Sequence, residues 1–260
     1  PGRCIRLWSP AEQQRRPAFS PPELLLADPK PVVMELAQWG SGLCEELPWL
    51  DPPPKAAMNE AQRELASLGL LTTDGRLTSI GTQLNGLGVH PRLGLLMLEA
   101  LRRGCPQLGC DLAAVLSERD PLAGEAAVGC DLQPRLAVLQ QHRTLADLSL
   151  QLRRQLDRVP LDRVPTPPPE TRRSDDANAA ELIAAVFPLW IAQARPGQPG
   201  RYRLRQGRGA VLPDLDPLIG SPALAVARVD TGGANTRIQL ALPMDAEMLL
   251  AIAKREGRWD

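Results

Sequence analysis

The sequence predicts a mainly α-helical protein that ends in a small β domain. Ala and Leu dominate its apolar residues, and aromatic residues make up only 3% of the 260 positions, which favours helices over extended sheets. Proline occurs 27 times, about twice its usual share of roughly 5%. The helices should therefore be short and joined by Pro-rich segments. Most strand patterns, punctuated by glycine, appear after residue 200.

The charge balance and the hydropathy pattern exclude several classes of protein. Thirty basic residues balance thirty acidic ones, which excludes a uniformly basic nucleic-acid coat but leaves room for a local basic patch. Hydrophobic residues reach 43%, which excludes wholesale disorder. No run approaches the roughly 18–20 apolar residues that span a bilayer, and no signal peptide is visible. We expect a cytoplasmic protein without a membrane partner. Because the chain begins Pro1-Gly2-Arg3, we expect it to come from the middle of a longer protein.

Residues 1–40 are expected to form a strand and two helices. Alternation of side chains over residues 3–8 predicts a short strand. Ser20, followed by Pro21, starts a short helix over 24–26, because a cap and a proline at the first helical position form a helix start. Asp28 and Pro29 repeat that start, and Gly40 ends the second helix.

Residues 41–89 have the outline of a winged-helix module. Asp51 and three prolines open a helix that stops at Gly69. The Asp74-Gly75 pair between short apolar runs is a strong hairpin signal. Thr78 then caps another helix, so the order is helix, small hairpin, helix.

Residues 90–155 should form a small helical bundle. Pro91 opens a very apolar helix that Gly104 ends, and a second helix covers 111–117. Asp131 caps a third, long helix with a leucine stripe that extends to Leu152.

A Pro-rich linker and the β domain complete the chain. The linker, 156–177, holds two tandem copies of LDRVP and a run of three prolines. The last segment, 178–260, begins with a helix over 179–190, continues as a small barrel-like β domain, and ends in a helix capped by Asp245. The expected strands are 201–205, 210–212, 224–229 and 237–242.

No motif for catalysis or metal binding is present. The sequence lacks a phosphate loop, and its two isolated histidines do not suit a Ser-His-Asp set. The five cysteines are odd in number without a C-x-x-C pair, so they are expected to be reduced and structural. A zinc site from Cys105, Cys110 and Cys130 is the disfavoured alternative. The Gly207-Arg208-Gly209 pattern fits a turn between strands better than a phosphate cradle. We predict neither a catalytic residue nor a metal site. On its motifs, the chain is expected to be a binding or regulatory module.

Several motifs, in order, resemble the C-terminal half of the DEAH/DExH-box helicases. They are PGRCIRLWSP, PPELLLAD, ELAQWG, WLDPPP and DGRLTSIGTQLNGLGVHPRLGLLML, and SERDPL also fits. GRYRLRQGRGAVL resembles the C-terminal region of the bacterial HrpB type. The resemblance implies that 1–40 end the second RecA-like lobe, that 41–89 are a winged helix, that 90–155 are a ratchet-like bundle and that 178–260 are the HrpB-type C-terminal helix and β domain.

The resemblance also implies a function. The chain would be the accessory region of an ATP-dependent helicase that grips single-stranded RNA or DNA and is coupled to RecA-like motor lobes upstream in the same polypeptide. ATP and Mg²⁺ belong to that motor, so the chain itself would hold no cofactor and be inactive alone. The alternative is a stand-alone winged-helix protein that binds nucleic acid or regulates without enzymatic activity.

Two groups of arginines are candidate nucleic-acid contacts. The first group lies on one predicted strand and its turn, where guanidinium groups suit a phosphate backbone; a solvated edge strand is the alternative reading. The second group lies in the bundle and could line a strand channel, as ratchet domains do in related helicases; isolated surface charges are the alternative. The first group is Arg201, Arg203, Arg205 and Arg208, and the second is Arg92, Arg102, Arg103 and Arg119.

Overall fold

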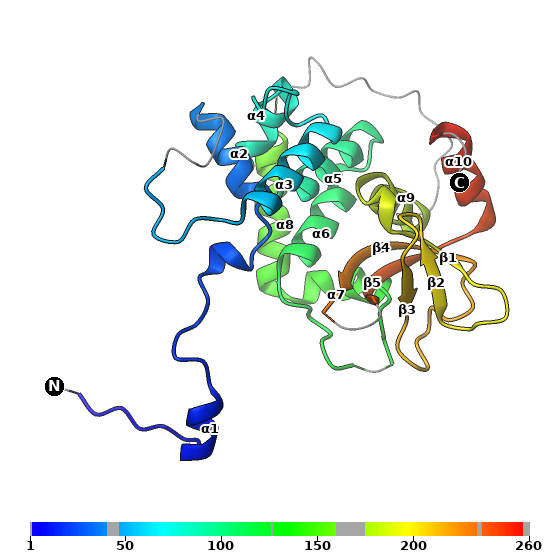
Figure 1. The fold of residues 1–260 in the computed structure, drawn as a ribbon. Coiled ribbons are helices and arrows are strands. Elements are labelled where there is room, and N and C mark those ends of the chain that lie inside the picture. The colour runs from blue at the N-terminus through cyan, green and yellow to red at the C-terminus, as the bar shows by residue number, and fades with distance from the viewer. Residues whose placement is uncertain (1, 41–46, 126, 160–174, 233–235, 257–260) are drawn as a thin grey trace. The chain divides into compact units, whose positions relative to one another are not determined.

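The computed structural model describes residues 2–40, 47–125, 127–159, 175–232 and 236–256. The chain divides into two compact units, Pro1–Thr82 and Gln83–Asp260 (Figure 1). Most of the predicted linker, residues 160–174, lies outside the described residues. The finer domain boundaries expected from the sequence stay predictions.

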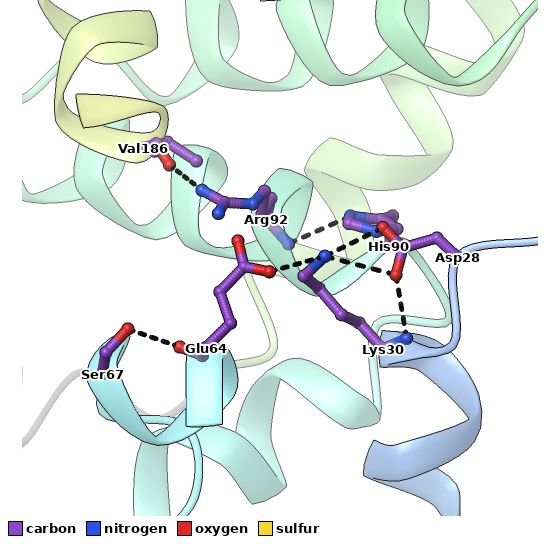
Figure 2. A network of polar contacts seen from close by, with 7 residues as sticks. All are labelled: Asp28, Lys30, Glu64, Ser67, His90, Arg92 and Val186. Carbon is purple, nitrogen blue, oxygen red and sulfur yellow. Dashed lines mark hydrogen bonds and ion pairs between the residues drawn. The ribbon is translucent and has the colours of Figure 1, made fainter. Parts of the chain in front are cut away.

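The first unit contains short helices, all of which except the first were predicted from the sequence. They are α1 (Pro10–Arg15), the single 3₁₀ turn η1 (Glu23–Leu25), α2 (Lys30–Trp39), α3 (Lys55–Ser67) and the start of α4 (Ser79–Asn85). Gly40 and Gly69 follow α2 and α3 with φ of 79° and 72°, a conformation that favours glycine. Lys30 joins these two helices, because its Nζ lies 3.1 Å from Asp28 and 2.8 Å from Glu64 (Figure 2).

The strand predicted over residues 3–8 is not formed. Within the described residues no strand pairs with this segment, and Ile5 and Leu7 are 69% and 92% exposed. A strand is stabilised by hydrogen bonds to a partner, so an alternating sequence without one stays irregular. The side-chain pattern alone could not reveal the missing partner.

The Asp74-Gly75 turn forms as predicted, but its flanks are shorter than expected. Gly75 has φ of 81°, and Thr72 N–H donates to the Arg76 carbonyl at 2.8 Å. The flanks are reduced to a single antiparallel bridge between Leu71 and Leu77. Thr78 caps α4 as predicted, since its Oγ1 accepts from Gly81 N–H at 3.0 Å.

Four helices of the second unit pack around buried leucine, methionine and alanine side chains. In this unit α5 (Pro91–Arg102) packs on α6 (Pro106–Ser117), and α6 packs on α8 (Arg143–Leu156). Helix α9 (Asp175–Val186) contacts α5 and α6 as well as the sheet, so it joins the helical part to the β domain (Figure 1). Helix α6 begins at Pro106, five residues before its predicted start.

The predicted long helix after Asp131 is broken into three pieces. They are α7 (Gln133–Val138), the 3₁₀ turn η3 (Leu139–Gln141) and α8. Leu132, not the predicted Asp131, is the N-cap residue of the first piece, although Asp131 Oδ1 accepts from Gln133 N–H at 2.9 Å. His142 is extended, with φ of −100° and ψ of 98°, and separates the other two. Leu139 and Leu145 are buried on either side of the break, so the leucine stripe continues although the helix does not.

The C-terminal β domain is a closed five-stranded barrel. Its strands are β1 (Ile191–Ala194), β2 (Arg201–Leu204), β3 (Gly209–Val211), β4 (Ala223–Asp230) and β5 (Thr236–Met244). They pair in the order β1-β2-β3-β5-β4, with β4 returning to β1. Every pair is antiparallel except β3 with β5. This is the Greek-key barrel of the OB-fold, and it confirms the small β domain that the sequence predicts.

Strand β1 was missing from the sequence prediction, which continued the preceding helix through Trp190. That helix ends at Val186, and the turn η4 (Pro188–Trp190) leads into the strand. The closing helix α10 (Ala246–Glu256) is capped as predicted, because Asp245 Oδ1 accepts from Met248 N–H at 2.7 Å.

A buried ion pair fixes the connection between α6 and α7. Arg135 is 4% exposed, and its Nε and Nη2 donate to the two Asp120 carboxylate oxygens at 2.9 and 2.7 Å. Arg135 also donates to the carbonyls of Asp131 and Gly129 at 2.5 and 3.1 Å. Burial by itself would raise the pKa of Asp120, but hydrogen bonds from Arg135 and Leu122 N–H, with the nearby positive charges, outweigh burial and lower that pKa below 3.8.

Breaking this pair should destabilise the second unit. In Asp120→Asn the Arg135 guanidinium stays buried without its charge partner, so we expect the free energy of unfolding to fall by about 3 kcal/mol at pH 7. Chemical denaturation of both proteins measures this difference. Because the folded-state pKa of Asp120 is lowered, the carboxylate stabilises the fold fully above 3.8, and the difference between the proteins should shrink as the pH falls below that value.

Asp147→Asn is the matched control, because it removes the same kind of charge from an exposed pair. Arg143 and Asp147 lie 3.6 Å apart with side chains 95% and 71% exposed. That substitution should cost less than about 0.5 kcal/mol. Equal losses in the two variants would contradict the structural role of the Asp120–Arg135 pair.

Candidate nucleic-acid interface

Strand β2 turns two of the predicted arginines to the outside of the barrel. Along the strand, Arg201 and Arg203 are exposed, whereas Tyr202 and Leu204 are buried in the core. Tyr202 is anchored there by its hydroxyl, which donates to the Leu218 carbonyl at 3.1 Å. The strict alternation confirms that the two arginines share one face, as the sequence predicts.

The strand register places small or neutral residues beside these arginines. Arg203 lies opposite Gln193 on β1 and opposite Gly209 on β3, and Arg201 lies opposite Val211 on β3. On the outward side the arginines are therefore flanked by an amide, a glycine and a half-buried valine. None of these neighbours carries a negative charge.

A further arginine, which the sequence analysis did not select, lies on the same face. Arg195 follows β1, and its Nη2 atom lies only 3.2 Å from the point where a Cβ on Gly209 would be. Its guanidinium group therefore lies over the exposed glycine of β3. We call the outward side of β1, β2 and β3 with Arg195, Arg201 and Arg203 the arginine face. Arg195 was missed because its strand was missed; the Arg195-Pro-Gly turn before Arg201 was the available signal.

The arginine face has positive charge without an acidic partner. In the ranges that the structure describes, Arg195, Arg201 and Arg203 form no ion pair with a carboxylate. Guanidinium groups gathered in this way repel one another and favour a bound anion. Of the other two predicted residues in this part, Arg205 is half-buried at the end of β2, and Arg208 is exposed in the turn to β3.

The aromatic side chains of the barrel region lie elsewhere among the described residues. Tyr202 points into the core. Phe187 and Trp190 stack on each other with ring centroids 5.2 Å apart and an interplanar angle of 12°, and Trp190 packs against the barrel core. The arginine face therefore presents charge but no aromatic ring on which a base could stack.

Two of the bundle arginines connect helices to one another. Arg92 donates from Nη1 to the Val186 carbonyl at the end of α9 (Figure 2), and its guanidinium lies over the Phe187 ring at 5.2 Å. Arg103 donates to Glu99 on its own helix at 2.9 Å and to Glu181 on α9 at 2.7 Å. Both arginines therefore use their charge to attach α9 to α5.

The other two bundle arginines, Arg102 and Arg119, lie at the end of α5 and beyond the end of α6. Arg102 is half-buried and lies 3.7 Å from Glu99, and its buried Nε has no hydrogen-bond partner among the described residues. Arg119 is exposed beyond the end of α6. The structure thus brings Arg92 and Arg103 together as contacts to α9 and leaves Arg119 outside that contact.

In the described ranges, no three His, Cys, Asp or Glu side chains form a group suited to a metal ion. Among the described residues, Cys105, Cys110 and Cys130 form no disulfide. Burial raises the pKa of the Cys110 thiol to about 12 and also raises the pKa of Cys130. No helix in the described ranges is long and apolar enough to cross a membrane.

Comparison with known proteins relates the whole chain to one class of helicase. The chain is 31% identical over 252 residues to the ATP-dependent RNA helicase HrpB of Escherichia coli K12, covering 96% of this chain and 29% of that protein. It is 35% identical over 125 residues to the ATP-dependent RNA helicase HrpA of the same organism, covering 46% of this chain and 10% of that protein. No protein-family model matches the chain.

Solved structures agree with the sequence comparison. Two crystal structures of Escherichia coli HrpB superpose with TM-scores of 0.74 and 0.73, at 30% and 28% identity, over 95% and 92% of this chain and 28% of each HrpB chain. The chain thus corresponds to the C-terminal part of a DEAH/DExH-box helicase. Within that class it is close to HrpB. It spans less than a third of the length of these relatives.

The contact between α5 and α9 can be tested by a double-mutant cycle on Arg103 and Glu181. Their side chains are 16% and 17% exposed, so water screens the pair only partly. We expect the stabilities of Arg103→Ala, Glu181→Ala and the double variant to give a coupling of about 1 kcal/mol or more. The exposed Arg153–Asp157 pair is the control, with an expected coupling of about 0.3–0.5 kcal/mol. If the stability losses of Arg103→Ala and Glu181→Ala were additive, these side chains would not stabilise the contact between α5 and α9.

Proposed function

We propose that the chain is the accessory C-terminal region of an HrpB-type RNA helicase, which holds a single strand on the arginine face of its barrel. The observation that carries the proposal is the pair of exposed arginines on β2 of an OB-fold, Arg201 and Arg203, which form no ion pair within the described residues. Strands 2 and 3 of such barrels commonly form the face that binds oligonucleotides. The match to HrpB over 96% of the chain favours this reading over a stand-alone regulatory protein.

The proposal divides the candidate arginines by their partners. Arg201 and Arg203, with Arg205 and Arg208 at the end of the strand, would contact the nucleic-acid backbone. In the bundle, Arg119 is the exposed candidate, whereas Arg92 and Arg103 already contact α9.

We further propose that residues 41–89 act as a winged helix and residues 90–155 as a ratchet-like bundle. The α3–turn–α4 order supports the first assignment and the α5–α6–α8 packing supports the second.

ATP and Mg²⁺ would serve the whole protein through RecA-like motor lobes. The phosphate-binding motif of such a motor is absent from the 260 residues. The chain would therefore contribute by holding the strand while the motor moves it. Single-stranded RNA is the preferred candidate because both bacterial relatives are RNA helicases by name.

We expect that the purified 260-residue chain does not hydrolyse ATP, with or without RNA. The physical reason is that no residue pattern in it can hold the β- and γ-phosphates. A phosphate-release assay checks this. ATP turnover that follows the chain through every purification step would contradict the proposal that only the motor lobes hydrolyse ATP.

Removing three arginines should change the salt dependence of binding. Arg201, Arg203 and Arg205 replaced together by alanine would remove about three phosphate contacts. Because each contact with a single strand contributes about 0.7, the slope of log affinity against log salt should flatten by roughly 2. Fluorescence anisotropy with labelled oligo-U and oligo-dT, titrated from low to physiological salt, is the measurement.

The control removes three exposed arginines from the helical part. Arg143, Arg154 and Arg158 are exposed on or just after α8, and their replacement by alanine changes the net charge equally. This variant should keep the original slope and stay folded, because exposed substitutions usually change stability by about 0.5 kcal/mol or less. Circular dichroism of the other variant checks that the barrel tolerates alanine at the half-buried Arg205. If the two variants had equal slopes of log affinity against log salt, the arginine face would not be a specific binding surface.

A further inference from the structure

We propose that the turn over residues 213–216 is a strained latch that couples strand β2 to the connection between α6 and α7, with Asp216 as its positioning residue. The turn lies between β3 and β4. The latch is independent of the proposed function, because it consists of contacts inside the second unit and none of them requires nucleic acid.

The Asp216 carboxylate joins two segments of the chain. It is buried, with 5% of the residue exposed. Its Oδ2 accepts from Cys130 N–H at 2.8 Å, and its Oδ1 accepts from Leu218 N–H at 3.0 Å. Burial of a carboxylate is costly unless hydrogen bonds satisfy it, so both donors help to keep it inside. Asp216 therefore fixes the turn to the segment that follows α6.

The bundle holds the same segment from the other side. Arg135 on α7 donates to the Gly129 carbonyl at 3.1 Å and to the Asp131 carbonyl at 2.5 Å. The same guanidinium group is paired with the Asp120 carboxylate after the end of α6. The carbonyls of this segment are thus fixed by the bundle, while its Cys130 N–H is fixed by the barrel. A movement of the bundle connection is therefore transmitted to the barrel.

On the barrel side the contacts continue to strand β2. The Tyr202 hydroxyl donates to the Leu218 carbonyl at 3.1 Å, and the Leu218 N–H donates to Asp216. Tyr202 lies in β2 between the two exposed arginines of the arginine face. An unbroken series of hydrogen bonds and peptide links therefore runs from Asp120 to β2. Its two ends lie next to Arg119 and the arginine face, the candidate contacts in the two parts of this unit.

Close packing of the turn on the bundle connection requires glycine at position 129. Gly129 has φ of 52°. A Cβ there would lie 2.5 Å from Asp216 Oδ2 and 2.6 Å from Pro217 Cδ, closer than real Cβ atoms approach their neighbours. Any side chain would therefore push the carboxylate away from its donors. The bundle connection is thus shaped to receive Asp216.

The turn itself is strained. Among the described residues, Leu215 is the only non-glycine residue with a positive φ, 64°. It is the third residue of a β-turn in which Asp216 N–H donates to the Pro213 carbonyl at 3.3 Å, and glycine or asparagine is preferred there when φ is positive. Leu215 is 95% exposed, so packing of its side chain does not offset the strain. Such strain persists only where the surroundings impose it, and here the buried Asp216 imposes it.

These contacts define two states of the turn. In the closed state Asp216 is bound, Leu215 is left-handed, and movement of the α6–α7 connection is transmitted to β2. In the open state Asp216 leaves Cys130, and Leu215 relaxes to a negative φ. The strain reduces the free-energy difference between the two states, so the latch opens more readily than an unstrained turn would.

The first test compares two substitutions at Leu215 by native-state hydrogen exchange of the Cys130 amide in the full 260-residue chain. Leu215→Ala removes the apolar side chain but keeps the strain, so the exchange rate should stay within about twofold of the original. Leu215→Gly removes the strain, so exchange should slow by about threefold, because relief of the left-handed conformation outweighs the greater freedom of glycine in the open state. Equal exchange rates in the two variants would contradict a strained latch.

The second test opens the latch with Asp216→Asn. The amide side chain offers one acceptor oxygen in place of two, so it cannot satisfy both Cys130 N–H and Leu218 N–H. We expect exchange of the Cys130 amide to accelerate at least tenfold more than exchange of the Leu152 amide, which lies in the buried part of α8. Equal acceleration at the two amides would show a general loss of stability and would refute a local latch.

The third test asks whether the two ends of the series are coupled, with a double-mutant cycle on Asp120→Asn and Tyr202→Phe. Chemical denaturation of the second unit gives the unfolding equilibrium constants. Independent sites would have multiplicative effects within about twofold. We expect the double variant to be at least threefold less destabilised than the product of the single effects, because the Tyr202 hydroxyl has less to hold once the bundle connection is loose.

The control for this cycle combines Tyr202→Phe with Asp147→Asn, which removes a carboxylate from the exposed pair on α8. Its effects should be multiplicative. If the effects of Asp120→Asn and Tyr202→Phe were multiplicative as well, the bundle connection and β2 would not be coupled through Asp216.

Discussion

The segment from Gly129 to Leu132 ties the barrel to the helices of the second unit. It lies alongside β5, where Leu132 N–H donates to the Ala241 carbonyl at 3.0 Å and Ala241 N–H donates to the Cys130 carbonyl at 2.9 Å. The Cys130 side chain is part of the barrel core, and its N–H donates to the buried Asp216 carboxylate at 2.8 Å. The barrel therefore includes a piece of the helical part, and the arginine face is held in a fixed relation to α9 and the bundle.

The chain uses arginine in two ways, and the partner decides which. Arg135 and Arg103 are largely buried and face carboxylates, so they connect segments that are far apart in sequence. Arg228 likewise donates to the Leu116 carbonyl at 2.8 Å, from the barrel to the end of α6. On the arginine face, by contrast, charge is exposed and unpaired among the described residues. A guanidinium that is already satisfied stabilises the fold, whereas a group of unsatisfied ones has affinity left for phosphate.

Local rules accounted for several helix starts and ends and for the outward face of β2, but not for features that depend on distant partners. Proline at Pro91 and glycine at Gly40 act within one turn of helix, so the sequence near them is sufficient. Strand β1 exists because β2 and β4 lie on either side of it, and its four residues alone do not distinguish it from a continuing helix. The reach of Arg195 across β2 depends in turn on that strand, so the candidate site could be predicted only in part.

The overall charge of the chain limits what the arginine face can do by itself. The net charge is zero, so the long-range attraction that steers nucleic acid toward strongly basic proteins is weak here. At physiological salt, exposed charges act over only about 8 Å. In the proposed function, a face of three arginines would therefore hold a strand that is already close and would attract one from solution only weakly. In the proposed function the motor lobes bind the strand first. Because the barrel is covalently linked to them, the local concentration of the strand around the barrel is raised. Neutrality and a local basic face together suit an accessory grip better than an independent nucleic-acid-binding protein.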